Sequence, residues 1–80
     1  LELLPNAGIT EISGSAFVGQ SLANLNLRAD YGINVLVIKR GQELLVMPEL
    51  TEHIQEEDIL IIIGRDQQIT KLQNVQKTSS

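Results

Sequence analysis

Hydrophobic positions along the chain gather into short groups of strand length, separated by polar turns. The segment Val35–Ile38 is continuously apolar and rich in β-branched residues, which predicts a strand buried on both faces. A polar turn around Gly41 separates it from a second apolar group, Leu44–Met47, so the two segments predict a β-hairpin. Ile59–Ile63 is the most strand-like segment of the chain, and the shorter Ile9–Ile12 predicts a further strand.

Two other segments carry the spacing of helices. Leu22 and Leu25 fall on one helical face, with Ser21 in position to cap the N-terminus and Gly32 the C-terminus. A final helix is predicted to start near Asp66, and its apolar residues keep a spacing of three: Ile69, Leu72 and Val75. The order strand, helix, hairpin, strand, helix predicts an α+β domain with a small mixed β-sheet and two short helices.

Turn-forming and polar residues mark both ends of this domain. Residues 1–8 close on Pro5-Asn6-Ala7-Gly8 and are expected to be the end of a preceding element. The domain proper is assigned to residues 9–75, and residues 76–80 are expected to form a disordered tail. Because the chain opens on Leu1 rather than Met, we expect it to be one domain of a longer protein.

Composition narrows the classes of function. Eighty residues make one small domain, and 42% apolar with 20% charged residues is typical of a folded chain. The net charge is −4, and the six Lys and Arg are spread along the chain, which argues against a general nucleic-acid binder. The absence of cysteine fits a cytoplasmic location, and no apolar run approaches the roughly 20 residues of a membrane span.

The residues offer little catalytic chemistry. His53 is the only histidine, and a lone histidine in a polar segment is more often solvated than a general base. Its acidic neighbours, Glu52, Glu56, Glu57 and Asp58, match no metal-binding loop and are interpreted as a solvated turn before a strand. We therefore expect neither enzyme activity nor a metal site.

Several sequence landmarks follow one another between residues 9 and 72. They are a glycine before a short helix ending in Leu25-Asn26-Leu27-Arg28, then Tyr31-Gly32-Ile33-Asn34-Val35, Ile38-Lys39-Arg40-Gly41, Pro48, and Glu57-Asp58-Ile59-Leu60-Ile61-Ile62-Ile63-Gly64. In this order and spacing they resemble the RCK_C (TrkA-C) domain of gating subunits in Ktr-type and Trk-type potassium uptake systems. Many members have Gly-Asp where this chain has Glu57-Asp58, which puts the backbone shape of that turn in question.

This resemblance implies a TrkA C-terminal domain-like fold that pairs as a two-fold homodimer. It implies a cytoplasmic regulatory module beneath a membrane potassium transporter subunit, within an octameric ring of full-length subunits. Residues 1–8 are then the tail of a linker from a nucleotide-binding RCK_N domain, and NAD(H) or ATP/ADP is expected only in that domain. In Gram-positive members the C-terminal dimer binds cyclic di-AMP, which switches uptake off.

Cyclic di-AMP has two phosphates, two adenines and two-fold symmetry, so each half-site needs a cation, an amide and an apolar wall. Arg28 can contact a phosphate through two hydrogen bonds, and Asn34 can both donate and accept. The apolar wall for the base is assigned to four residues: Leu22, Ala23, Val35 and Pro48.

Other interpretations of the same residues stay open. Arg28 near a helix end also fits a surface cation that compensates the helix dipole, Asn34 fits a turn residue, and Leu22 fits the core. The module could also be a purely structural dimerisation domain, or the regulatory domain of a cation–proton antiporter. A metal-sensing variant through the His53 region is a remote alternative.

Overall fold

The computed structural model describes residues 1–79, with side chains through Gln76. Its elements in chain order are β1 (Glu2–Leu4), β2 (Ala7–Ser13), the 3-10 turn η1 (Ser15–Phe17), α1 (Leu22–Leu25), α2 (Leu27–Tyr31), β3 (Asn34–Arg40), β4 (Glu43–Val46), β5 (Ile59–Arg65) and α3 (Asp66–Ser79). No helix among these is long and apolar enough to cross a membrane.

The five strands form one sheet in the order β1-β2-β5-β3-β4, with β5 at its centre. Every neighbouring pair is antiparallel, so the α+β class is confirmed but the sheet is not the mixed one that the sequence predicted. A parallel pair needs a long crossover connection between neighbours. The helical connection here joins β2 to β3, which lie on opposite sides of β5 and do not pair.

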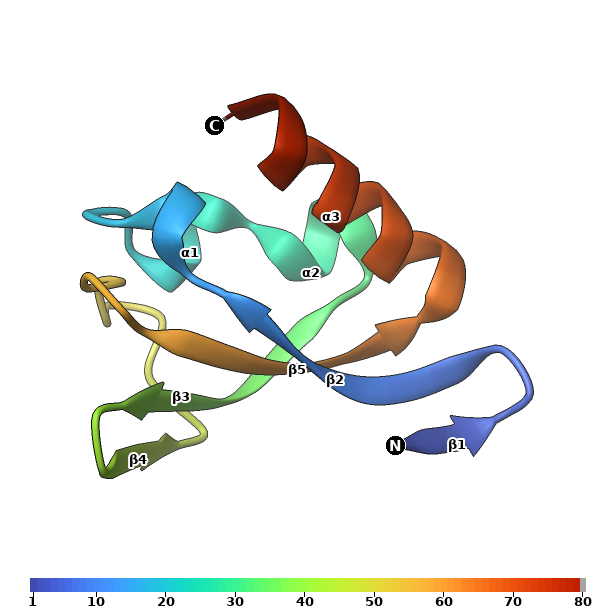
Figure 1. Cartoon of the computed structure of the whole chain (residues 1–80), viewed down its shortest axis with the longest axis horizontal. Coiled ribbons are helices and arrows are strands. Elements are labelled where there is room, and N and C mark those ends of the chain that lie inside the picture. The colour runs from blue at the N-terminus through green and yellow to red at the C-terminus, as the bar shows by residue number, and fades with distance from the viewer. Residues whose placement is uncertain (80) are drawn as a thin grey trace.

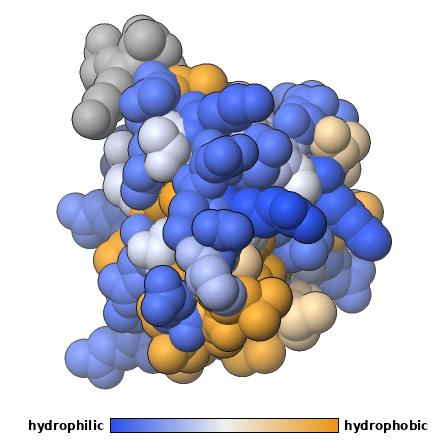
Figure 2. Space-filling view, turned by 90° about the vertical axis from the view of Figure 1, so that its right-hand side faces the viewer, coloured by the Kyte–Doolittle hydropathy of each residue, from blue (hydrophilic) through white to orange (hydrophobic). Residues whose placement is uncertain are grey.

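The helices cover one face of this sheet and leave the other uncovered within the described residues (Figure 1). β5 alternates accordingly, because Leu60 and Ile62 are fully buried whereas Ile61 and Ile63 are half-buried. Figure 2 shows apolar side chains gathered at the bottom of the molecule, where the sheet lies. The core between sheet and helices also includes Ile12, Phe17, Leu22, Leu27, Ile33, Ile38, Ile54, Ile69 and Leu72.

The predicted hairpin is present as β3 and β4. Arg40 lies opposite Glu43, so the connecting turn is Gly41–Gln42. Gly41 has a φ of 63°, in the left-handed region that a two-residue hairpin turn requires. Val35 and Val37 are half-buried rather than buried on both faces, because helices cover only one side of the sheet.

The first predicted helix is split in two. The Ser21 hydroxyl caps α1 as expected and accepts a hydrogen bond from the Asn24 N–H at 3.1 Å. Asn26 then takes a left-handed conformation with a φ of 51°, and the chain restarts as α2. Gly32 closes α2 with a φ of 68°, as predicted.

Both ends of the chain are more ordered than the sequence analysis expected. Residues 1–8 form an edge hairpin, since β1 pairs with the start of β2. The helix α3 runs through most of the segment assigned to a disordered tail, while Ser80 lies outside the described residues. The amide of Gln76 donates to the carbonyl oxygen of Ser13 at 2.6 Å, and this bond to the end of β2 ties down the helix beyond Val75.

Candidate ligand-binding groove

An open groove of about 900 Å³ lies between the α1–α2 segment, the start of β3 and the chain after β4. All six residues that the sequence analysis assigned to a ligand site line it. The full lining is Leu22, Ala23, Asn26, Leu27, Arg28, Ala29, Ile33, Asn34, Val35, Leu36, Met47, Pro48 and Leu50. Residues from three separate segments are thus brought together on one surface.

One wall of the groove is helical. Leu22 and Ala23 come from the first turn of α1, and Arg28 comes from α2. The Arg28 side chain is exposed, and its guanidinium has no hydrogen bond or ion pair with any side chain or carbonyl of residues 1–76. A cation without an internal partner is therefore available to an anionic ligand.

The opposite wall comes from β3 and the segment after β4. Asn34 is the first residue of β3, is exposed, and makes no side-chain hydrogen bond within the described residues. Pro48 is half-buried and follows Met47, whose φ of 49° is unusual for a non-glycine residue. The Met47 N–H donates to the Leu36 carbonyl at 2.7 Å, which fixes this wall to β3.

The electrostatics of the groove differ from those of the chain as a whole. Its lining contains the cation of Arg28 and no carboxylate, although the chain carries a net charge of −4. The two side-chain amides of Asn26 and Asn34 are the uncharged polar groups of the lining. This composition suits a ligand with anionic and heteroaromatic parts.

Three lining residues were missed by the sequence analysis: Asn26, Met47 and Leu50. Met47 and Leu50 expose 69% and 68% of their surface, an unusual state for large apolar residues. The placement of Met47 next to Pro48 was a usable signal. The left-handed turn at Asn26 had no comparable signal, because Leu22 and Leu25 predict one continuous helix.

The alternative roles can now be set against the geometry. Leu22 is both core and groove, since it is only 8% exposed and still lines the groove. Arg28 does lie in the last turn of α2, but that helix has only five residues and therefore a small dipole. Asn34 shows no bond to its own backbone, as a turn residue would make.

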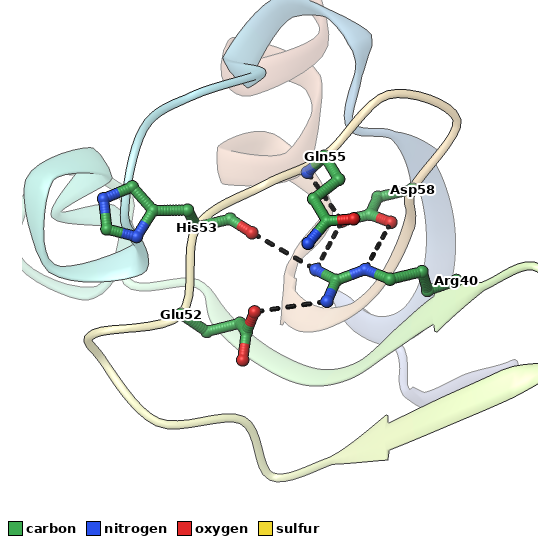
Figure 3. Close-up of polar contacts among 5 residues, drawn as sticks. All are labelled: Arg40, Glu52, His53, Gln55 and Asp58. Carbon is green, nitrogen blue, oxygen red and sulfur yellow. Dashed lines mark hydrogen bonds and ion pairs between the residues drawn. The ribbon is translucent and has the colours of Figure 1, made fainter.

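A second polar site was missed entirely and surrounds Arg40 (Figure 3). The guanidinium contacts both carboxylate oxygens of Asp58, with Nε–Oδ1 at 3.1 Å and Nη2–Oδ2 at 2.9 Å. It also donates to Glu52 Oε2 at 3.2 Å and to the His53 carbonyl at 3.2 Å. Asp58 is 1% exposed, so the interpretation of this acidic segment as a solvated turn is wrong for Asp58 and holds for the exposed Glu56 and Glu57.

The Arg40 site controls the protonation of a buried carboxyl. Burial by itself raises the pKa of Asp58, but the hydrogen bonds from Arg40 and from the Gln55 N–H, with the Arg40 charge, lower that pKa below its ordinary value. The same pairing raises the pKa of Arg40. Both groups are therefore charged at neutral pH, and each neutralises the other.

The turn that carries Asp58 resolves the departure noted in the sequence. Glu57 has a φ of 67°, the left-handed conformation that glycine favours. The backbone therefore takes the shape that glycine suits, even though the residue is glutamate. Glu57 is not among the residues that line the groove.

His53 takes part through its backbone rather than its ring. Its side chain is exposed and points away from the Arg40 site in Figure 3. Its backbone forms an isolated antiparallel bridge with Ser21. Among residues 1–79, no group of three His, Cys, Asp or Glu side chains is arranged to hold a metal ion.

The TrkA-C domain model matches residues 7–77, which is nearly the whole chain. The chain belongs to the TrkA-C domain family. Its start also agrees with the structure, because β2 begins at Ala7 rather than at the predicted Ile9.

Two curated relatives and one solved structure share this domain. The chain is 45% identical over 74 residues to Ktr system potassium uptake protein C of Bacillus subtilis, which covers 91% of this chain and 34% of the relative. It is 33% identical over 60 residues to the K(+)/H(+) antiporter subunit KhtT of Bacillus subtilis, covering 74% of this chain and 36% of that protein. The chain thus spans about a third of these relatives' length.

The solved structure is the RCK C domain of the potassium transport protein KtrA in complex with cyclic di-AMP. It superposes with a TM-score of 0.81 at 36% identity and covers 85% of this chain and 81% of the KtrA chain. The resemblance to RCK_C domains and the TrkA C-terminal domain-like fold are confirmed by these matches.

Proposed function

We propose that this domain is a regulatory module of a potassium uptake system that binds cyclic di-AMP in the groove. The observation that carries the proposal is the groove itself, where the unpaired Arg28 lies among amide and apolar residues. The TrkA-C family and the 45% identity to a Ktr potassium uptake protein support the transport context. The similarity to a KtrA domain in complex with cyclic di-AMP supports the choice of ligand.

Each part of the ligand has a partner in the groove. Arg28 supplies a bidentate contact for a phosphate, and the Asn34 amide serves a polar edge of adenine. Leu22, Ala23, Val35 and Pro48 supply the apolar wall for the base. The absence of carboxylates from the lining removes the objection raised by the acidic composition of the chain.

The groove of one chain holds half of a symmetric ligand. The site is therefore proposed to lie on the two-fold axis of a homodimer, where each residue occurs twice. The exposed side chains of Met47 and Leu50 line the groove and supply apolar surface for a second copy. Ligand favours the dimer geometry to which it binds more tightly, and this difference in affinity is the regulatory signal.

The wider assembly follows from the resemblance. We expect a cytoplasmic location, an octameric ring of full-length subunits and a membrane potassium transporter subunit as partner. No cofactor other than cyclic di-AMP is proposed for this domain, and NAD(H) or ATP/ADP is assigned to a preceding RCK_N domain. Residues 1–8 would then connect to that domain.

The antiporter context is a second candidate, supported by the 33% identity to the antiporter subunit KhtT. The same groove then serves a different membrane protein, and the ligand can activate rather than inhibit. The sequence that adjoins this domain in the full protein distinguishes the two contexts, since a glycine-rich dinucleotide-binding start is expected only for a Ktr subunit.

Titration calorimetry of the purified chain with cyclic di-AMP tests the proposal, with cyclic di-GMP as control. Binding in the micromolar range or tighter, at one ligand per two chains and without a response to cyclic di-GMP, is the expected result. No heat and no thermal shift with cyclic di-AMP would leave a purely structural dimerisation domain.

A further inference from the structure

Arg40 is connected to the groove although it does not line it. Its guanidinium makes four hydrogen bonds, and two of them end on residues 52 and 53 of the segment between β4 and β5 (Figure 3). The other two hold Asp58 at the end of that segment. Arg40 thus ties the strand β3 to both the middle and the end of a twelve-residue connection without helix or strand of its own.

The middle of this connection supports both walls of the groove. The Leu22 N–H donates to the Glu52 carbonyl at 3.0 Å, and the Ala23 N–H donates to the Leu50 carbonyl at 2.9 Å. Leu22, Ala23 and Leu50 all line the groove. The first turn of α1 therefore takes its position from residues 50–52, and Glu52 joins the two sites because its side chain bonds to Arg40.

The rest of the connection provides little to fix residues 50–53. Ile54 is buried and anchors one point in the core. At the other end, Met47 keeps an unfavourable φ of 49°, a conformation that persists only where the surroundings enforce it. Between these points, the charged hydrogen bond from Arg40 to Glu52 is the side-chain contact that holds the segment.

We propose that Arg40 is a positioning residue of the groove, which acts through Glu52 to hold residues 50–53 against α1. This inference rests on the proposed function for its binding consequence, while its structural part concerns the ligand-free chain. Arg40 does not touch the ligand in this arrangement. It sets the separation of the two walls, so its effect on affinity is indirect.

Glu52→Ala is the variant that isolates this role. It removes the arm of the network that reaches the groove and leaves the paired Arg40 and Asp58 in place, so the fold is retained. Glu11→Ala is the matched control, because Glu11 pairs with Lys39, the neighbour of Arg40 on β3, in an exposed ion pair at 3.4 Å. Arg40→Lys keeps the charge but loses the planar fork and should act in the same direction as Glu52→Ala.

Amide hydrogen exchange in the ligand-free chain is the first measurement. Glu52→Ala should speed exchange at Leu22 and Ala23 by about fivefold to tenfold relative to Leu60 in the central strand, as expected for losing one charged hydrogen bond at a half-exposed position. Glu11→Ala should leave this ratio unchanged. Equal acceleration at all three amides, or none, would show that Glu52 and Arg40 contribute only to general stability and would overturn the proposal.

Affinity for cyclic di-AMP by calorimetry is the second measurement. Glu52→Ala should weaken binding by about fivefold, and Glu11→Ala should not change it. Unchanged affinity with local exchange raised would separate the wall from the ligand and overturn the positioning role. If the unmodified chain binds no cyclic di-AMP, the proposed function fails, and the exchange ratio still decides whether Arg40 holds the wall.

Discussion

Two arginines lie in neighbouring parts of this domain and have opposite surroundings. Arg40 directs its guanidinium at two carboxylates and a carbonyl, and its side chain is 21% exposed. Arg28 is exposed on a five-residue helix and has no internal partner among residues 1–76. The first cation is satisfied by the fold and the second is left for something outside it.

This difference separates stability from recognition by chemistry alone. A guanidinium that is already paired contributes to the fold and has little capacity for a ligand phosphate. An unpaired guanidinium in a groove without carboxylates contributes little to the fold and retains its full capacity. Substitutions at the two positions should therefore affect different measurements.

The largest expected effect is on folding. Arg40→Gln should lower the free energy of unfolding by about 3 kcal/mol, because it leaves the buried Asp58 carboxylate without a counter-charge. Arg28→Gln should change that free energy by less than about 0.5 kcal/mol. Urea denaturation of both variants at neutral pH measures the contrast, and equal losses would remove the distinction between the two arginines.

The reverse contrast is expected for binding. Arg28→Ala should weaken cyclic di-AMP binding by about 1.5–3 kcal/mol, the contribution of a hydrogen bond to a charged group. Arg65→Ala is the control, since Arg65 is equally exposed and lies outside the groove. Titration calorimetry compares them, and an unchanged affinity for Arg28→Ala would exclude this residue from the site.

Acid should act on the Arg40 site and leave the Arg28 region alone. The pKa of Asp58 is lower in the folded chain than its ordinary value of 3.8, so the unfolded chain binds more protons in acid. The stabilisation is present above the ordinary pKa and is lost as the pH falls through the folded pKa. Denaturation between about pH 5 and about pH 2 should therefore show a steeper loss for the native sequence than for Asp58→Asn. Parallel curves would mean that Asp58 does not titrate differently on folding.

The smallest effect concerns the turn that presents Asp58 to Arg40. Glu57→Gly should raise the free energy of unfolding by about 0.5 kcal/mol, because the relief of a left-handed φ exceeds the entropy that glycine adds to the unfolded chain. Glu56→Gly at the neighbouring position, where φ is not positive, should lower it instead. Thermal unfolding of the pair tests the sign, and a loss in both would show that the left-handed turn carries no strain.

Most of the fold could be predicted from local patterns. The hairpin, the central strand and the caps at Ser21 and Gly32 follow from apolar grouping and turn chemistry that act over a few residues. The six groove residues were assigned through the family resemblance, and the structure brings them onto one surface. Their contact with a ligand stays a prediction.

The remainder depends on contacts between distant segments. Nothing near Arg40 in the sequence indicates that Asp58, eighteen residues later, becomes buried beside it. The edge hairpin of residues 1–8 and the extension of α3 likewise depend on the sheet and on the bond between Gln76 and Ser13. The all-antiparallel order depends on where β5 inserts, which no local pattern records.

The central place of β5 has a consequence for how the chain reaches its native state. β2 is complete at residue 13, but its ladder partner β5 is not available until residues 59–65. A growing chain can close the β3–β4 hairpin early, since that pairing is local, yet β2 and β3 stay unjoined until β5 enters between them. Sheet formation is therefore a late event that needs nearly the whole domain to have left the ribosome, and the exposed β2 and β3 edges before it are the period of greatest aggregation risk.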